Sequence, residues 1–443
     1  MIQQIATSLY ARVAVYLFFA AALIAINYFT PRTNFIQLIS LYAILFGIYL
    51  YILFYWKDEK IIREAKIISV VFRVFLLFSI PNLSDDFYRF IWDGRISAAG
   101  FNPYLYTPQQ IAEKQFYLSD SDHLTKHLFD QLNSQAYFTV YPPVPQFIFL
   151  SSHILSGEGF FNDIYFLRTF IILAETGTIY LLPKILAKQN LPSAHVLLYA
   201  LNPLIIIELT GNLHFEAVMI FFLVIAIYFL LQKKYLISAT AFGFAIATKL
   251  WPLMLLPFFI RYIGWKRSLV YACAALGTAA ILYVPFYNEQ ILGNMQSSLQ
   301  LYFSAFEFNA GLYYFFGWLT GFRHETRAWI QIILPFVVLI SVVIMSLYYK
   351  KEKLFDYFLF VFLLYFLCAT TVHPWYIAPL IFFACLTHYK FPVIWSFLIF
   401  FTYIAYQNSL YRENYFITGI EYILLASFLF YEYRQRKKLQ VRA

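Results

Sequence analysis

Long apolar runs, joined mostly by short polar segments, constrain the fold of this chain more than any other feature of its sequence. A helix that crosses a bilayer needs roughly 20 consecutive residues that are mostly apolar. Charged residues make up 12% of the chain, whereas a soluble globular protein carries about 25%. The runs lie at residues 12–29, 36–56, 67–81, 143–157, 165–183, 193–208, 215–232, 236–260, 268–286, 330–349, 355–372, 375–387, 392–406 and 416–433. They predict an all-α, polytopic transmembrane bundle of about 11–14 membrane segments.

The runs group into three parts along the chain. Residues 1–66 form an N-terminal helical pair, and residues 331–443 supply C-terminal membrane helices with a basic tail. Residues 67–330 form a membrane core, which includes a long polar loop at 82–141. We therefore expect one membrane-embedded unit with a single large polar excursion in its first half.

Basic residues indicate which side of the membrane each loop faces. Lys57–Lys66 and Arg434–Lys438 are rich in Lys and Arg, so both should lie in the cytoplasm. Counting spans from these two anchors places the loop at 82–141 and the segment His373-Pro-Trp375 on the outer face. We expect a multi-pass protein of the plasma (inner) membrane whose functional site faces outward.

Two interrupted stretches leave part of this topology open. The run at 236–260 contains Lys249 and Pro252, which favours two short helices over one span. The run at 143–157 is short enough to be either re-entrant or a true crossing. The orientation of residues 143–157 and 209–260 is therefore not fixed by the sequence.

Composition also excludes several classes of function. The net charge is +9, but the bases lie mostly in short loops, which is typical of cytoplasmic membrane loops and not of a nucleic-acid surface. The chain has no GxGxxG or Walker motif, so nucleotide chemistry in a soluble head is not expected. Its three cysteines have no CxxC spacing, which argues against a zinc site or a disulfide framework.

The polar loop begins with the most informative segment of the sequence, Ser84-Asp-Asp-Phe-Tyr-Arg-Phe-Ile-Trp-Asp-Gly-Arg95. Ser84 is a good helix N-cap, and it puts Asp85 and Asp86 in the first turn, where the helix dipole favours negative charge. Gly100 should end this helix, and Asn102-Pro103 should start an extended exit. We expect an amphipathic interfacial helix with carboxylates at its membrane-proximal end.

The charged residues of this helix allow two interpretations. Arg89 lies one turn from both Asp85 and Asp93, so intrahelical ion pairs on a capped surface helix would explain them. However, ionisable groups beside a membrane are costly and are usually functional. We therefore take Asp85 and Asp86 as candidate catalytic residues.

Other polar residues stand out because they lie next to apolar runs. Lys249 either extends to the membrane surface or binds an anionic headgroup. His373 either ends a helix or contacts a ligand, and His214 and Glu216 begin the next helix without a third ligand at metal spacing. The candidate substrate-binding residues are Arg89, Asp93, Arg95, Asn102, Tyr141, His214, Glu216, Lys249, Glu307, Asn309, His373 and Trp375.

A carboxylate, a His and several bases at one outer interface suit the transfer of a group from a lipid phosphate. The bases and the His would hold a phosphate leaving group, and the carboxylate would deprotonate an incoming hydroxyl. An Asp near its ordinary pKa is already ionised at neutral pH. No cofactor is required for this chemistry, although Asp85 and Asp86 could recruit a divalent metal.

The segment at 84–95, followed by Ala98-Ala-Gly-Phe-Asn-Pro-Tyr104, resembles the first outer loop of GT-C glycosyltransferases. The chain is most similar to polyprenyl-phosphate-mannose-dependent bacterial mannosyltransferases. The resemblance covers roughly residues 67–380. Shorter motifs follow in the family's order at Tyr141-Pro-Pro143, Asn202-Pro203, Gly211–Glu216, Thr248–Pro252, Glu307–Tyr313 and Val372–Tyr376.

The resemblance implies a GT-C-type bundle that inverts the anomeric centre of a lipid-linked sugar. It maps the catalytic carboxylate onto Asp85 or Asp86, without deciding between them. It places His373 near the donor phosphate, and it implies that Lys249 binds donor or acceptor. Some relatives bind metal through Asp-x-Asp, whereas the two acids here are adjacent.

The leading hypothesis is therefore an inverting hexosyltransferase, with mannose as the expected sugar. Its partners would be a polyprenyl-phosphate sugar donor, a glycan or glycolipid acceptor on the outer face, and the lipid bilayer, with no nucleic acid. The alternative is a transporter or flippase for a polyprenyl-linked lipid or sugar. Transporters place ionisable groups at the bilayer midplane, often at broken helices of repeated halves. Lys249 at a helix break fits a transporter better, but the clustered acids and the absence of a visible repeat favour the enzyme.

Overall fold

The structure is a computed structural model that describes residues 6–113, 123–157, 159–408 and 411–442. Within these residues the fold is helical, and the only β contact is an isolated bridge between Phe308 and Thr371. The helices of the N-terminal part and of the polar loop are α2 Leu9–Phe29, α3 Phe35–Tyr55, α4 Glu59–Phe75, α5 Asp86–Ala98, α6 Pro108–Glu113, α7 His123–Asp130 and α8 Pro143–Ser156.

The central part of the chain forms long helices and several short or broken ones. These are α9 Phe160–Lys188, η1 Ser193–His195, α10 Val196–Ala200, η2 Ile205–Gly211, α11 Glu216–Leu231, α12 Tyr235–Ile246, η3 Trp251–Leu255, α13 Phe258–Ile263, α14 Trp265–Tyr283 and η4 Val284–Phe286. The last part holds α15 Ile291–Ala305, α16 Leu312–Leu319, α17 His324–Tyr348, η5 Lys351–Lys353, α18 Leu354–Cys368, η6 Pro374–Ile377, α19 Ala378–Cys385, α20 Phe391–Leu398, η7 Ile399–Gln407 and α21 Tyr415–Arg442.

Six helices of the described residues are long and apolar enough to cross a membrane, and the chain is a multi-pass membrane protein. They are α2, α3, α9, α14, α17 and α21. A further pair, Ser193–Ala200 and Ile205–Gly211, is bent by 55° at its break. The expected break in the run at 236–260 is confirmed, because α12 ends at Ile246 and η3 starts at Trp251. Several apolar runs thus form short or bent helices instead of full spans.

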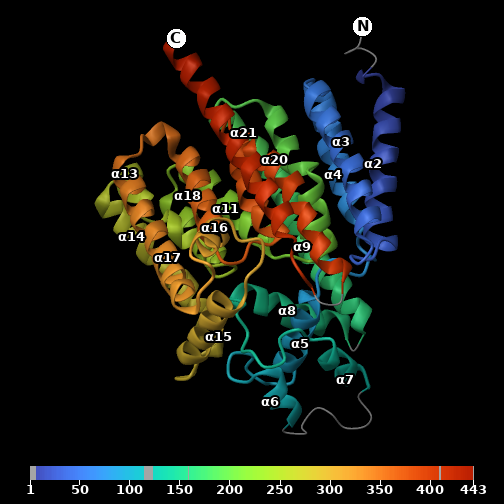
Figure 1. Ribbon diagram of the computed structural model, residues 1–443, viewed down its shortest axis with the longest axis vertical. Helices are drawn as coiled ribbons and strands as arrows, with labels where there is room; N and C mark the ends of the chain where they lie inside the picture. The colour runs from blue at the N-terminus through green and yellow to red at the C-terminus, as the bar shows by residue number, and fades with distance from the viewer. Residues whose placement is uncertain (1–5, 114–122, 158, 409–410, 443) are drawn as a thin grey trace.

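The elements of the polar loop gather at one end of the molecule, as Figure 1 shows for α5, α6, α7 and α8. Both chain termini lie at the opposite end. Helices from all three predicted parts pack together, with α3 on η7, α4 on α10 and α11 on α19. The division into three parts remains a prediction.

The helix of the polar loop differs in detail from the expectation. It begins at Asp86, with Asp85 as N-cap, while Ser84 Oγ accepts a hydrogen bond from the Asp86 N–H at 3.3 Å. Gly100 ends it as predicted, at a φ of +87°. The prediction of an extended exit at Asn102-Pro103 is wrong, because Asn102 Oδ1 accepts a hydrogen bond from the Tyr104 N–H at 3.0 Å and closes a turn. An Asn side chain readily makes such a local bond, and it competes with extended backbone.

Helix α5 is covered on more sides than an amphipathic surface helix would be. Phe87, Phe90 and Trp92 are all buried, although they point in different directions around the helix. α8 packs closely against it, since a Cβ added to Gly94 would lie 2.5 Å from the Phe149 carbonyl oxygen. This packing fixes the position of the aspartates at the start of α5.

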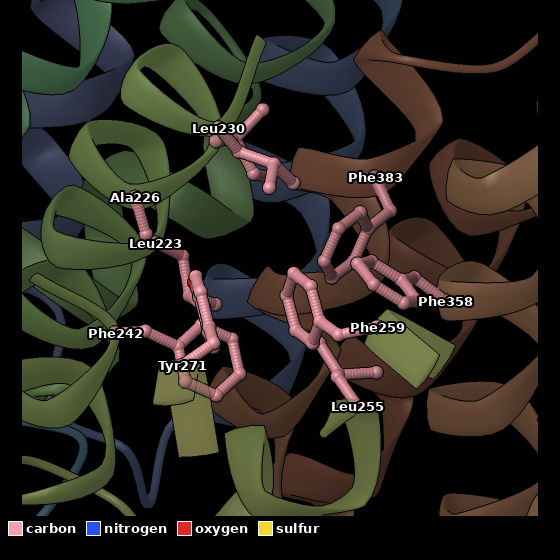
Figure 2. Close-up of a pocket in the computed structure, with 10 residues that line it drawn as sticks. Leu223, Ala226, Leu230, Phe242, Leu255, Phe259, Tyr271, Phe358 and Phe383 are labelled. Carbon is pink, nitrogen blue, oxygen red and sulfur yellow. The ribbon is translucent and has the colours of Figure 1, made fainter. Parts of the chain in front are cut away.

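Figure 2 shows a small apolar cavity between α11, α12, α13 and α18. Leu223, Phe242, Phe259 and Phe358 line it together with Tyr271, whose hydroxyl is hydrogen-bonded with Ser238 at 3.0 Å. Because no polar group of the lining lacks a partner, we attribute this cavity to imperfect packing and not to ligand binding.

Candidate active site

The two aspartates at the start of α5 lie in different surroundings. Arg32, in the loop between α2 and α3, places Nη2 2.6 Å from Asp85 Oδ2. The same guanidinium covers the ring of Tyr406, 4.9 Å from its centroid. The negative charge of Asp85 is therefore balanced by Arg32 in an ion pair.

Asp86 has no such partner at ion-pair distance within the described residues. Burial raises the pKa of its carboxyl to about 6, the Lys249 charge opposes that rise, and the charges of Asp85 and Glu216 add to it. Its side chain is nevertheless only partly covered. Asp86 is thus an accessible carboxyl in a low-dielectric position, with a pKa close to neutral pH.

Lys249 and Glu216 form the charged pair that faces Asp86. Lys249 Nζ lies 2.9 Å from Glu216 Oε1, and the side chains are 20% and 0% exposed. Glu216 is the first residue of α11, where the helix dipole favours an anion. The ammonium also lies 5.3 Å from the ring centroid of Trp251 and 5.7 Å from that of Tyr376. The break between α12 and η3 thus directs a lysine toward the aspartates, a charge–aromatic arrangement that stabilises it there.

Three stacked ring contacts lie beside this pair. His214 stacks on Trp375 at a centroid distance of 3.7 Å, and His373 stacks on the same indole at 4.4 Å. Phe308 stacks on His373 at 4.9 Å. Because a histidine covers each face of Trp375, the indole cannot offer a free face to a sugar, and only its edge is available.

His373 is the more accessible of the two histidines. Its side chain is partly exposed, whereas His214 is 2% exposed. Burial and the Lys249 charge lower the pKa of His373 to about 3, so the imidazole is neutral at physiological pH. Its Nδ1 is buried and makes no hydrogen bond within the described protein. A neutral His in this position can donate or accept one hydrogen bond, but it adds no charge.

Behind His214 lies the carboxyl group of Glu208, which was not among the residues predicted from the sequence. Glu208 Oε2 is 3.7 Å from His214 Nε2, and Glu208 Oε1 accepts a hydrogen bond from the Tyr403 hydroxyl at 2.7 Å. Glu208 stands within an apolar run, Leu204-Ile-Ile-Ile-Glu208. A single charge in such a run was the available signal, because an acid buried in a membrane segment is costly and is usually functional.

The segment around Phe308 is fixed by acids from the C-terminal part. Asn309 has a φ of +47°. Its N–H donates to Glu413 Oε2 at 2.5 Å, and its Nδ2 donates to Glu421 Oε1 at 3.1 Å. These bonds place the loop so that Phe308 reaches His373. Asn309 was a candidate from the sequence, whereas Glu413 and Glu421 were not.

Glu307 points to a different set of groups. It accepts a hydrogen bond from the Tyr313 hydroxyl at 2.6 Å and lies 3.6 Å from Arg327. Neither contact involves Asp86 or Lys249. Its predicted role in substrate binding remains a prediction.

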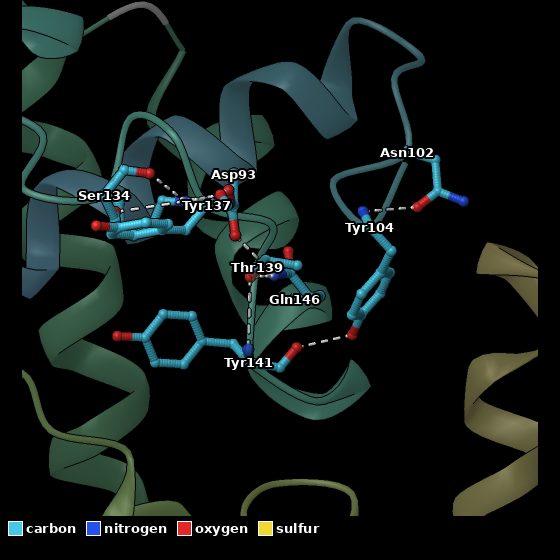
Figure 3. Close-up of polar contacts among 9 residues, drawn as sticks. Asp93, Asn102, Tyr104, Ser134, Tyr137, Thr139, Tyr141 and Gln146 are labelled. Carbon is cyan, nitrogen blue, oxygen red and sulfur yellow. Dashed lines mark hydrogen bonds and ion pairs between the residues drawn. The ribbon is translucent and has the colours of Figure 1, made fainter. Parts of the chain in front are cut away.

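The remaining candidates on α5 make contacts within the protein. Arg89 Nε lies 2.7 Å from Asp93 Oδ1, and this buried ion pair is the intrahelical pair that the spacing allowed. Asp93 also accepts from Gln146 Nε2 at 2.8 Å, which links α5 to α8, as Figure 3 shows. Arg95 Nη2 lies 3.2 Å from Asp163 Oδ2 on α9.

Asn102 and Tyr141 belong to the same supporting network. Asn102 Nδ2 donates to the Phe286 carbonyl at 2.6 Å. The Tyr104 hydroxyl donates to the Tyr141 carbonyl at 2.8 Å (Figure 3). The ring of Tyr141 packs edge-on against Phe90 and Phe149. These contacts fix the polar loop relative to α5, and a direct role of either residue in binding remains a prediction.

The structure thus brings together Asp86, His214, Glu216, Lys249 and His373, which are far apart in the sequence. In the described ranges, no group of three or more His, Cys, Asp or Glu side chains is arranged to hold a metal ion. The arrangement offers one accessible carboxyl, one ammonium and one neutral imidazole at one place.

Comparison with known families matches residues 19–265, more than half of the chain, to the family described as alpha-(1->6)-mannopyranosyltransferase, N-terminal domain. The chain belongs to this family. The matched region includes Asp85, Asp86, Glu216 and Lys249, while His373 lies beyond it. A search of curated proteins found no significant match.

The family and the spans together establish the general activity. The chain is a multi-pass membrane mannosyltransferase, consistent with a GT-C bundle. A glycosyltransferase of this kind uses a sugar donor and a glycan acceptor beside the bilayer. The resemblance to GT-C mannosyltransferases seen in the sequence is confirmed at the level of the family.

Proposed function

We propose that the protein transfers mannose from a polyprenyl-phosphate sugar to a glycan or glycolipid acceptor on the outer face of the plasma membrane, with Asp86 as general base. The observation that carries this proposal is the different state of the two adjacent acids. Asp85 is paired with Arg32 at 2.6 Å, whereas Asp86 has no cation at ion-pair distance among the described residues and faces Lys249. The choice between them, which the sequence leaves open, falls on Asp86.

The transfer step follows from the groups present. The oxygen of an acceptor hydroxyl attacks the anomeric carbon, and its proton moves to the Asp86 carboxylate. The bond between the anomeric carbon and the phosphate oxygen breaks, and its electron pair leaves with polyprenyl phosphate. Attack from the face opposite the phosphate inverts the anomeric centre. With a pKa of about 6, Asp86 is mostly ionised at neutral pH and still basic enough to accept the proton.

The leaving phosphate would lie between Lys249 and His373. Lys249 supplies the positive charge, because the charge that develops on a leaving phosphate is stabilised by a fixed cation. His373, being neutral, supplies one hydrogen bond from its imidazole, whose side chain is partly exposed. Glu216 holds the ammonium in place, since its carboxylate lies 2.9 Å away.

The outer-face orientation rests on charge at the opposite end of the bundle. The site lies near the end of the molecule that holds α5 and α8, whereas both termini lie at the other end (Figure 1). The basic segments Lys57–Lys66, at the start of α4, and Arg434–Lys438, near the end of α21, belong to that other end (Figure 1). Positive loops mark the cytoplasmic side, so the site would face outward.

The proposal is tested by comparing Asp86→Asn with Asp85→Asn in membranes supplied with radiolabelled polyprenyl-phosphate-mannose. A general base contributes roughly 10²–10⁴-fold, so we expect Asp86→Asn to lose at least about a hundredfold in kcat, with a smaller loss for Asp85→Asn. The matched variant controls for the loss of one negative charge at the same turn. Wild-type turnover by Asp86→Asn would refute the base assignment.

Donor and orientation need separate measurements. Polyprenyl-phosphate-glucose and a nucleotide-linked mannose should each support much less transfer than polyprenyl-phosphate-mannose. Ala136→Cys, at an exposed position of the loop between α7 and α8, should react with a membrane-impermeant maleimide added to the outside of intact cells, in a background without native cysteines. Labelling only after the cells are opened would place the site in the cytoplasm and end the proposal.

A further inference from the structure

The guanidinium of Arg168, buried among the membrane helices, bonds two chain segments, one that leads to the aspartates and one that leads to His214. Arg168 of α9 is fully buried. Its Nε donates to the Thr210 carbonyl at 2.9 Å, and its Nη2 donates to the Gly211 carbonyl at 2.9 Å. Its Nη1 donates to the carbonyls of Leu77, at 2.9 Å, and Ser79. No carboxylate of the described residues pairs with it.

The two segments held by Arg168 are distant in sequence, and each leads directly to residues of the candidate site. Leu77 and Ser79 precede the aspartates in the loop between α4 and α5. Thr210 and Gly211 end η2, directly before His214 and Glu216. Carbonyls at a broken helix end inside a membrane are costly unless they are satisfied, and Arg168 satisfies those of both segments with one rigid group.

Asn212 joins the same two segments a second time. Its Oδ1 accepts from the N–H groups of Asn82 at 3.2 Å and Leu83 at 3.0 Å, and its Nδ2 donates to the Ile207 carbonyl at 3.0 Å. Asn212 is fully buried, so these bonds are not weakened by solvent.

Asn82 extends the connection to a third segment. Its Nδ2 donates to the carbonyls of Ile26 at 2.8 Å and Thr30 at 2.6 Å, at the end of α2. That end leads directly to Arg32, the partner of Asp85. One hydrogen-bonded unit of Asn82, Arg168 and Asn212 therefore connects the segments that carry Arg32, the two aspartates, and the His214–Glu216 turn.

The close fit at this unit leaves little freedom for the segments to move. A Cβ added to Gly211 would lie 2.1 Å from Asn27 Oδ1 on α2, so the end of η2 lies directly against α2. The turn that follows holds Leu213 at a φ of +64°, which a non-glycine residue adopts only when its surroundings enforce it.

We propose that Asn82, Arg168 and Asn212 are positioning residues that set the placement of the Asp86 carboxyl relative to Lys249 and Glu216. This inference rests on the proposed function, because it assigns the unit to the placement of the proposed base. Arg168 touches no reacting atom; it acts by fixing the loop ends. A misplacement of about 1 Å in such a group costs on the order of a hundredfold in rate.

The test compares Arg168→Lys with Arg73→Lys. Arg73 is also fully buried, and it bonds Glu175 and the Ala200 carbonyl, away from both loops. A lysine cannot span the carbonyls of two segments as the guanidinium does. Four quantities are measured for each variant: the melting temperature in detergent, kcat, KM for the polyprenyl-phosphate donor, and the pH midpoint for carbodiimide modification of Asp86.

We expect both variants to lower the melting temperature, but only Arg168→Lys to lower kcat, on the order of tenfold or more with little change in KM. We also expect only Arg168→Lys to move the modification midpoint of Asp86 to lower pH. Burial is the largest cause of the raised pKa of that carboxyl, and a released loop would rehydrate it. The other groups that face Asp86 are Lys249, Asp85, Glu216, Tyr406 and the hydrogen-bonded side chain of Asn133, and neither substitution removes any of them.

A wild-type kcat and midpoint in Arg168→Lys, or equal shifts in Arg73→Lys, would overturn the inference. If Arg168→Lys does not fold, Asn82→Ala takes its place, because Asn82 is only partly buried. It should change the midpoint and kcat in the same direction by a smaller factor, and no change would also overturn the inference. Carbodiimide modification needs no turnover, so it decides the inference even if the wild-type protein does not use the proposed donor.

Discussion

The charges beside Asp86 should set the pH at which the enzyme loses activity, and exchanging them should move that pH in opposite directions. The Lys249 charge lowers the pKa of Asp86, and the Glu216 charge raises it. Lys249→Gln and Glu216→Gln each remove one charge and keep a polar side chain of similar length.

The expected size of the effect follows from the position of the carboxyl. Its pKa is raised from the ordinary 3.8 to about 6, so roughly nine tenths of it is ionised at pH 7 and about one tenth at pH 5. If Asp86 is the base, kcat/KM should fall on the order of tenfold between these two pH values. A solvated carboxyl at its ordinary pKa would lose only about a tenth of its activity over that range.

Each substitution also releases the partner of the residue that it removes. In Lys249→Gln the ammonium 2.9 Å from Glu216 is lost, so the charge of Glu216 acts on Asp86 unopposed. The pKa of Asp86 should rise, and activity should be lost at a higher pH. In Glu216→Gln the Lys249 ammonium acts on Asp86 unopposed, so the pKa of Asp86 should fall and activity should be lost at a lower pH. With an effective dielectric of about 20 near a protein surface, each shift should be on the order of one pH unit.

The assay is the pH dependence of kcat/KM for transfer from radiolabelled polyprenyl-phosphate-mannose, which reports the ionisation of the free enzyme. Melting temperatures over the same pH range control for unfolding. A wild-type acid limb near pH 4, or shifts of the same sign in the two variants, would refute the assignment of Asp86 as base.

Three further outcomes are expected. Glu175→Gln strands the fully buried Arg73, whose guanidinium lies 2.8 Å from the carboxylate, and should cost roughly 3–5 kcal/mol of stability; an unchanged melting temperature in detergent would contradict this. Gly94→Ala puts a methyl group 2.5 Å from the Phe149 carbonyl oxygen and should cost about 1–3 kcal/mol, whereas Gly293→Ala, with no atom within 4 Å of its Cβ, should melt like the wild type. Chelation with EDTA should leave transfer intact, and a loss that Mg²⁺ or Mn²⁺ restores would show that a labile metal takes part.

Local patterns predicted much of the fold. The position of each apolar run, the break between α12 and η3, and the end of α5 at Gly100 follow from hydropathy, from Pro252 and from the conformational freedom of glycine. The turn at Asn102 was not predicted, because its side chain bonds a backbone N–H two residues away. Such a bond competes with extended backbone, and the sequence alone does not weigh the two.

The sequence predicted single residues of the candidate site but not how they pair. Asp86, Lys249 and His373 stood out as polar residues beside apolar runs, so each was a candidate by itself. The ion pair between Arg32 and Asp85 joins residues that are 53 positions apart, and no spacing rule relates them. Glu208 and Arg168 were not selected because the groups that they contact are distant in the sequence: Tyr403 is 195 positions from Glu208, and Leu77 is 91 positions from Arg168.

The sequence by itself determined that this chain is a membrane-embedded helical bundle with acids in a polar loop, because hydropathy and charge act residue by residue. Only the tertiary structure decided which acid is paired with a cation and which is not. That difference depends on the end of α2, on the break after α12 and on the turn after η2, which come together when the helices pack. The ionisation of a carboxyl depends on the burial and charges around it, and those surroundings exist only in the folded chain.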